Sequence, residues 1–204
     1  MARSDVQLML GVKAGDDASF ELLLAKYRSP LVHFLFRMVR DAATAEDLAQ
    51  EVFLRVYRAR KKYAPSAKFT TWLFRIATNL ALNSIRDSRN AKMGISIDDP
   101  AGAGGSAGDS AENSQARMDV ADKRPGMVER MMEHDRAAVI KRAILALPEK
   151  QRAAVLLHKY HDLDYGEIAG ILDCSESALK SLLFRAYETL RLELAPLVNQ
   201  TGNR

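Results

Sequence analysis

The feature that most limits the fold of this 204-residue chain is an internal stretch with almost nothing to pack. Residues 98–119 consist mainly of Gly, Ala, Ser and acidic residues, with very few apolar side chains to bury. Such a stretch cannot offset the entropy lost on ordering, so we expect residues 90–134 to form a flexible linker. The linker divides the chain into two predicted modules, residues 1–89 and 135–197, followed by a short tail at 198–204.

The N-terminal module shows the apolar spacing of helices. Apolar side chains recur at steps of three and four over residues 20–38 and again over 48–56, which places them on one helix face. The first of these helices contains Pro30, which lacks a backbone donor and can bend it. The second is expected to begin near Thr44 as its N-cap, and a third is expected over residues 70–86. No segment of the sequence alternates in the manner of a strand, so the predicted fold class is all-α.

The C-terminal module contains a predicted helix-turn-helix. Asp164 and Glu167 have the spacing of a capping box, with Asp at the cap and Glu three residues later. A tight turn separates the short helix that this box opens from a longer helix, for which Ser175 is a favourable N-cap. In this motif the second helix is the one that enters a major groove. The helices expected in this module are those over residues 137–146, 149–160, 165–172 and 176–194.

Composition and missing motifs exclude several classes of protein. The single cysteine rules out a disulfide framework, and no apolar run approaches the roughly 20 residues of a membrane span. The N-terminus lacks an apolar signal segment, so we expect a cytoplasmic protein. His158 and His161, taken with His134 or Cys174, lack a recognised zinc spacing, and we expect no metal and no cofactor. The sequence has no nucleophile elbow, phosphate loop or Ser/His/Asp set, so no catalytic activity is expected.

A stripe of polar and aromatic side chains lies on the third predicted helix, opposite its apolar face. The net charge of +4 is too small to establish a nucleic-acid partner. Basic residues interleaved with aromatic ones nevertheless suit single-stranded nucleic acid, whose bases need stacking partners. The alternative is that Trp72 covers the edge of the core and the other residues form a solvated face. The candidates in this stripe and in the loop before it are Lys61, Lys62, Tyr63, Lys68, Phe69, Trp72, Arg75, Asn79 and Arg86.

The last predicted helix has a polar face near its start. Side chains on this face can reach base edges and phosphates in a major groove. The alternative is a plain helical hairpin whose polar face is only solvated, but the turn length, the cap and the polar stripe together favour DNA binding. The candidate residues are Glu176, Ser177, Lys180, Ser181 and Arg185.

Several stretches carry a resemblance to a known family. Bacterial RNA polymerase sigma factors of the extracytoplasmic-function (ECF) type have a first domain that is similar to DAATAEDLAQEVFLRVYRA at 41–59 and KFTTWLFRIATN at 68–79. The second domain of the family resembles ALPEKQR at 146–152, DYGEIAGIL at 164–172 and SALKSLLFRA at 177–186. The resemblance covers nearly everything except the linker and the two tails. Two separate motifs in the correct order are far more specific than a lone helix-turn-helix.

The resemblance implies that core RNA polymerase is a partner. Asp47, Gln50 and Glu51 lie in the stretch that matches the family's docking surface for the clamp helices of the largest polymerase subunit. The polymerase flap is a second implied contact, and the linker would thread the polymerase interior towards the RNA exit path. An anti-sigma factor that clamps the two domains together is a further implied partner, and no direct membrane insertion is expected.

The resemblance also implies that promoter DNA is a partner. Trp72 and Asn79 match the positions that hold the melted non-template strand at the minus-ten element, and the loop at 61–71 matches the loop that captures a flipped base there. The helix from Glu176 matches the reader of the minus-thirty-five element. The two-domain architecture would then direct polymerase to a subset of promoters and help to open them.

The sequence departs from the family at some positions, and other functions remain alternatives. Leu182 and Tyr187 stand where many members carry Arg, and Asp173 replaces a frequent turn glycine, which requires a left-handed Asp or a different turn. One alternative function is a stand-alone helix-turn-helix transcriptional regulator whose N-terminal module binds a ligand or forms a dimer. Another is a helical adaptor that binds only proteins. Neither needs the stripe of Trp72 and Asn79 or the docking helix.

Overall fold

The all-α architecture is confirmed by a computed structural model that describes residues 3–92, 127–161 and 163–201. These residues form α-helices and one 3-10 turn, without a strand. The elements are α1 (Asp5–Ala14), α2 (Asp17–Val39), α3 (Ala42–Ala59), η1 (Arg60–Lys62), α4 (Phe69–Lys92), α5 (Met127–Ala146), α6 (Glu149–Tyr160), α7 (Tyr165–Leu172) and α8 (Glu176–Thr201).

The ends of several helices differ from those expected. α1 was not expected, and it begins with a capping box between Ser4 and Gln7. The expected N-cap at Thr44 is wrong, because α3 begins earlier and the Asp41 carboxylate accepts a hydrogen bond from the Thr44 backbone N–H at 2.7 Å. This bonding to Thr44 lowers the pKa of Asp41. α2 continues through Pro30.

The expected linker overlaps helical residues at both of its ends. α4 continues to Lys92, and α5 begins at Met127 rather than near Ala137. α8 likewise extends beyond its expected end at Leu194. The expected flexible stretch at 98–119 lies outside the described residues.

The helix-turn-helix has the expected capping box. The Glu167 backbone N–H donates to the Asp164 carboxylate at 2.8 Å, and the Asp164 N–H donates to the Glu167 carboxylate at 3.0 Å. Asp173 ends α7 in the left-handed conformation, with φ of 52°, so the turn is kept without glycine. The Ser175 hydroxyl accepts from the Ala178 N–H at 3.1 Å and caps α8 as expected.

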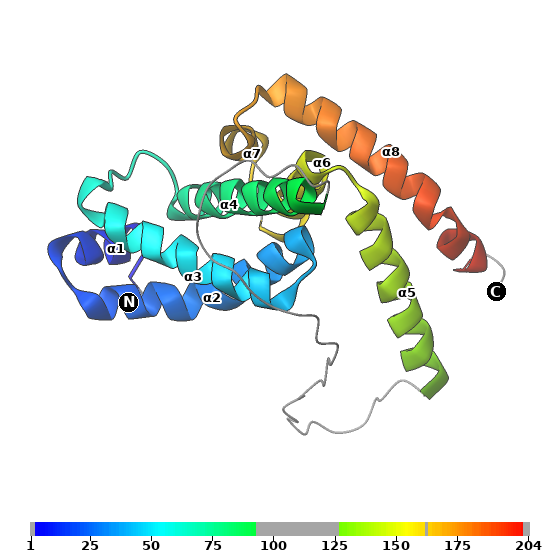
Figure 1. Cartoon of the computed structure of the whole chain (residues 1–204), viewed down its shortest axis with the longest axis horizontal. Helices are drawn as coiled ribbons and strands as arrows, with labels where there is room; N and C mark the ends of the chain where they lie inside the picture. The colour runs from blue at the N-terminus through cyan, green and yellow to red at the C-terminus, as the bar shows by residue number, and fades with distance from the viewer. Residues whose placement is uncertain (1–2, 93–126, 162, 202–204) are drawn as a thin grey trace.

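The N-terminal and C-terminal modules share one hydrophobic core. α4 packs on α2 and α3 and also contacts α6 and α7. It therefore lies between the other helices of its own module and the C-terminal module (Figure 1). The rings of Phe34 and Phe74 meet edge to face, with centroids 5.3 Å apart. The His161 ring, just beyond α6, lies 4.0 Å from the Phe74 ring and 5.6 Å from the Phe34 ring. The modules are therefore joined by side-chain packing as well as by the chain.

A buried arginine bonds the ends of two helices at this junction. Arg152 on α6 is only 6% exposed. Its guanidinium donates to the carbonyl of Met38 at 2.6 Å, and to the carbonyls of Leu145 and Leu147 at 2.9 and 3.0 Å. Arg40 also donates to the Leu145 carbonyl. Carbonyls at the C-terminus of a helix lack partners within that helix, so Arg152 satisfies groups of both modules at once.

We expect Arg152→Met to lower the free energy of unfolding by about 2–4 kcal/mol, because it leaves buried carbonyls without their charged donor. Urea denaturation followed by circular dichroism measures this loss. Arg191→Met is the matched control, since Arg191 is exposed on α8 and its ion pair among the described residues is with Glu188. Its effect should stay within about 0.5 kcal/mol. Equal losses in the two variants would contradict a special role for Arg152.

Candidate nucleic-acid interface

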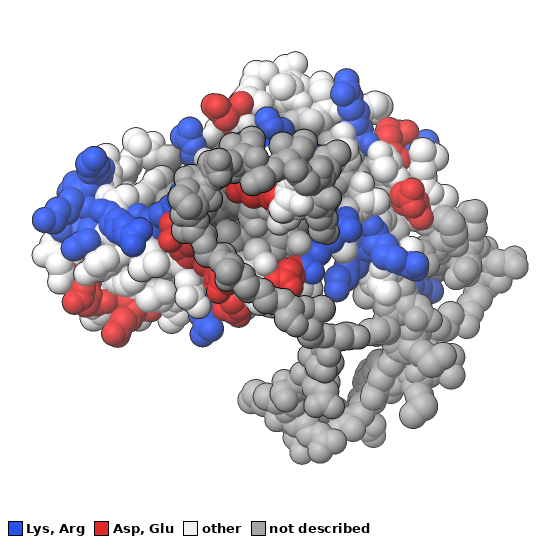
Figure 2. All heavy atoms as spheres, viewed as in Figure 1, with Lys and Arg blue, Asp and Glu red and all other residues white. Residues whose placement is uncertain are grey.

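The polar stripe of α4 is exposed as expected. Arg75, Asn79 and Arg86 have exposed side chains on this helix. The exposed lysines Lys61 and Lys62 lie at the other side of the preceding loop. Lys and Arg side chains gather at the end of the molecule where α3, η1 and this loop lie (Figure 2). A single strand that follows α4 would therefore meet positive charge along its backbone.

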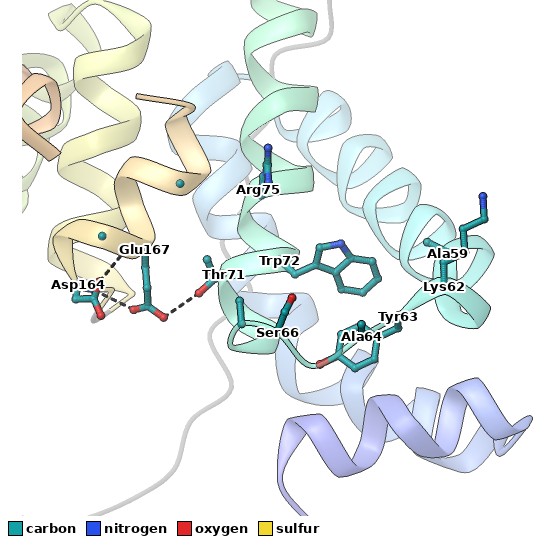
Figure 3. A pocket seen from close by; sticks show the side chains of 13 residues that line it. Ala59, Lys62, Tyr63, Ala64, Ser66, Thr71, Trp72, Arg75, Asp164 and Glu167 are labelled. Carbon is teal, nitrogen blue, oxygen red and sulfur yellow. Dashed lines mark hydrogen bonds between the residues drawn. The ribbon is translucent and has the colours of Figure 1, made fainter. Parts of the chain in front are cut away.

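Trp72 belongs to both the core and the surface. It is half-buried, and its ring centroid lies 5.3 Å from that of Tyr63 and 6.1 Å from that of Phe69. In Figure 3 the indole extends from α4 toward the loop that carries Tyr63. Trp72 thus packs on the core edge, as the alternative interpretation had it, while part of the ring stays accessible to a base.

The structure corrects the expectation for Tyr63 and Phe69. Both were expected to offer ring faces to bases, but Tyr63 is 5% and Phe69 1% exposed. The two rings belong to the core beneath Trp72, where they fix its position. The sequence spacing could not predict that these rings are buried, because aromatic side chains in a basic loop can lie either at the surface or in the core.

A cavity opens between the loop, α4 and α7. It has a volume of about 730 Å³ and is lined by Tyr63, Thr71, Trp72 and Arg75 on one side and by Glu167 on the other. Cavities of this size hold drug-sized ligands or a nucleotide. The Thr71 hydroxyl donates to the Glu167 carboxylate at 2.9 Å (Figure 3). The sequence predicted Glu167 only as a cap for α7, because a contact between residues 96 positions apart has no local signal.

The face expected on α8 is exposed along its whole length. Glu176, Ser177, Lys180, Ser181 and Arg185 all have exposed side chains, while Leu179, Leu183 and Ala186 on the opposite side are buried. Phe184 also lies among them and is 69% exposed, although it was not a predicted site residue. Phe184 lies four residues after Lys180 and three after Ser181, and this spacing could have placed it on the same helix face.

The expected docking residues lie on the outer face of α3. Asp47 and Gln50 are exposed, whereas Glu51 is half-buried and forms an ion pair with Arg55 at 2.7 Å. Beside them a groove of about 690 Å³ runs between α2 and α3. This groove was not predicted from the sequence, and its apolar lining residues are Phe20, Leu24, Ala49, Phe53, Leu54 and Tyr57.

Two of the candidate histidines lie against aromatic side chains. The His158 Nδ1 atom lies 2.9 Å from the Tyr187 hydroxyl, and His161 packs between Phe34 and Phe74. Over the described ranges, no group of three or more His, Cys, Asp and Glu residues is placed to hold a metal ion. Among the same residues, no helix is both long and apolar enough to cross a membrane.

Comparison with known proteins identifies the family. Residues 23–91 match Sigma-70 region 2 and residues 137–190 match Sigma-70 region 4. The RNA polymerase sigma-H factor of Pseudomonas aeruginosa is 32% identical over 198 residues, which cover 96% of each chain. The ECF RNA polymerase sigma-E factor of Escherichia coli K12 is 28% identical over 197 residues, 97% of each chain. This chain belongs to the ECF-type sigma factors.

The two matched regions define its function as promoter recognition in transcription initiation, and the stand-alone regulator is not favoured. Region 2 contains most of α2, all of α3 and nearly all of α4, while region 4 contains the helix-turn-helix. The solved structure of the sigma factor RpoE in complex with the anti-sigma factor NepR from Bartonella quintana has the same fold. It aligns with a TM-score of 0.59 and 20% identity over 86% of this chain and 96% of that one.

We expect Tyr63→Phe to leave the free energy of unfolding unchanged or to raise it by up to about 1 kcal/mol, because the buried Tyr63 hydroxyl has no partner among the described residues. Burial raises the pKa of this hydroxyl, as does the Asp5 carboxylate. Tyr63→Ala should lower the free energy by about 3 kcal/mol through the cavity that it leaves. Urea denaturation of both variants tests this, and a strong loss in Tyr63→Phe would show that the hydroxyl has a bonding role.

Proposed function

We propose that region 2 of this sigma factor captures the melted non-template strand at the minus-ten element. The exposed stripe of α4 supports this role, since Trp72 presents part of its ring beside Arg75 and Asn79. Flipping a base costs a few kcal/mol, whereas stacking it on an aromatic side chain contributes about 1–3 kcal/mol. A pocket for unpaired bases can therefore trap an opened duplex without ATP, with Lys61, Lys62, Lys68 and Arg86 as phosphate contacts.

Region 4 would read the minus-thirty-five element as duplex through α8. Lys180 and Arg185 are exposed and positioned for phosphates, while Ser177 and Ser181 are short enough for base edges to approach. The Ser181 hydroxyl donates to the Ser177 carbonyl at 3.1 Å, which leaves its oxygen available as an acceptor. Glu176 at the start of α8 can accept from a cytosine amino group.

Core RNA polymerase would dock on the outer face of α3. Asp47, Gln50 and Glu51 supply the polar part of this surface for the clamp helices, and the groove between α2 and α3 adds an apolar part. The flap would contact region 4, and residues 90–134 would act as the linker through the polymerase. If polymerase holds regions 2 and 4 at a fixed distance, binding of one region to a promoter raises the effective concentration of the other region at its own element.

The remaining assignments follow from family membership. We infer a cytoplasmic factor without catalytic activity of its own. An anti-sigma factor is an expected partner, because a solved structure with this fold is named as a complex with one. Such a partner would bind both regions and cover the polymerase and DNA surfaces together.

Asn79→Ala is expected to impair promoter opening without loss of polymerase binding, because Asn79 is exposed and contributes nothing to the core. Holoenzyme with this variant should form closed complexes but give several-fold less permanganate-reactive DNA. A template with a pre-melted minus-ten bubble is the control, and it should restore most of the signal. Normal opening of duplex promoters by the variant would mean that this stripe of α4 is only solvated.

Lys180→Ala is expected to weaken binding of holoenzyme to all promoters and to reduce the slope of log affinity against log salt by about one unit. Fluorescence anisotropy with promoter duplexes at several salt concentrations measures both effects. Lys159→Ala, which removes an exposed lysine of α6, is the matched control. If the slope stays constant while base preference changes, Lys180 contacts bases rather than phosphate.

A further inference from the structure

Glu167 connects the helix-turn-helix to the surface proposed for single-stranded DNA. Its side chain is 14% exposed in the ion pair with Lys68, whose Nζ lies 3.1 Å from Oε2. Its Oε1 accepts the hydrogen bond from the Thr71 hydroxyl at 2.9 Å. Lys68 and Thr71 belong to the loop and first turn that carry the stripe of α4. An acid of region 4 is thus held by the strand-binding surface of region 2.

Besides the Asp164 N–H of the capping box, the Glu167 carboxylate is bound by two side chains of types that bind phosphate in nucleic-acid complexes, Lys68 and Thr71. Lysine ammonium groups and threonine hydroxyls are among the side chains that contact phosphate oxygens. In this structure they hold two oxygens of one carboxylate at the rim of the cavity beside Trp72. The carboxylate therefore stands where the chemistry of the site favours a phosphate.

We propose that Glu167 occupies a phosphate site of the melted strand, so that region 4 and single-stranded DNA compete for region 2 and the free chain is closed. The proposal rests on the assignment of the α4 stripe to the minus-ten strand. α7 forms one wall of the cavity, so a strand that enters along Trp72 must displace it. The closed chain thereby limits its own binding to DNA before polymerase separates the two regions.

The spacing of the two promoter elements requires this separation. Elements centred near minus ten and minus thirty-five are roughly 25 base pairs apart, which corresponds to about 85 Å at 3.4 Å per base pair. Glu167 belongs to α7, which a short turn joins to α8, yet it contacts Thr71 on α4 within hydrogen-bond distance. While Glu167 is bonded to Lys68 and Thr71, α4 cannot lie on the minus-ten element and α8 on the minus-thirty-five element at the same time.

Glu167→Gln tests the competition with little effect on the fold. Glutamine serves as well as glutamate at the third position of a capping box, so the cap on α7 is retained while the negative charge is lost. Glu188→Gln on α8 is the control, because it changes net charge equally, while the ion pair of Glu188 among the described residues is with Arg191 on the same helix. A fluorescent single-stranded oligonucleotide with a minus-ten sequence serves as the probe for the full chain without polymerase.

We expect Glu167→Gln to bind this oligonucleotide about 3- to 10-fold more tightly than Glu188→Gln, with the difference shrinking at high salt. A second measurement follows closure directly, through fluorescence energy transfer between labels at Ala43→Cys and Ala178→Cys in a Cys174→Ser chain. Ala43 and Ala178 are both exposed. The oligonucleotide should lower the transfer efficiency as α7 leaves α4.

The outcomes separate the two proposals. Equal affinities of Glu167→Gln and Glu188→Gln, with binding that still depends on Asn79, would overturn the competition and leave the strand assignment standing. Transfer efficiency that does not change on binding would likewise overturn it. Binding that is absent from every variant, or independent of Asn79, would contradict the strand assignment and the competition together.

Discussion

The stripe of side chains that α4 presents to a DNA strand depends on the packing of this helix on two sides. Leu73, Phe74 and Ala77 fix one side in the core with α2 and α3, and Thr71 faces α7 on another. Arg75 and Asn79 stay in solvent on the remaining side. Because the backbone of α4 is held by buried side chains, polar residues on the stripe keep a fixed spacing, which a loop could not guarantee.

The sequence could predict what depends on local spacing. The capping box at Asp164, the short turn and the apolar steps of the long helices are each defined within a few residues, and the structure has them. Where two good caps lie close together, as Asp41 and Thr44 do, the sequence does not decide between them, and the carboxylate prevails at the positive end of the helix. The helix α1 was missed because its few buried side chains, such as Met9, form too short a pattern.

The candidate site was predictable by its charged residues and less so by its aromatic ones. The arginine, lysine and asparagine candidates were chosen because they lie opposite the apolar face of a helix. The same position leaves them exposed in the structure. Tyr63 and Phe69 are buried because α1 and α2 supply neighbours that lie far away in the chain, such as Tyr27, whose ring centroid is 5.4 Å from that of Phe69. The contact between Glu167 and Thr71 depends in the same way on how the two regions pack.

The junction between the regions combines contacts of very different strength. Arg152 and the rings around His161 are buried, whereas the pairs of Lys68 with Glu167 and Arg89 with Glu149 are partly exposed and contribute little in water. Moving such an equilibrium from 1% to 99% open requires about 5.5 kcal/mol of preferential binding to the open form. A partner that binds α3 and region 4 at separate points can supply this, whereas a short single strand on region 2 alone supplies only part of it. Polymerase and promoter would then open the chain together, because each stabilises the same open form.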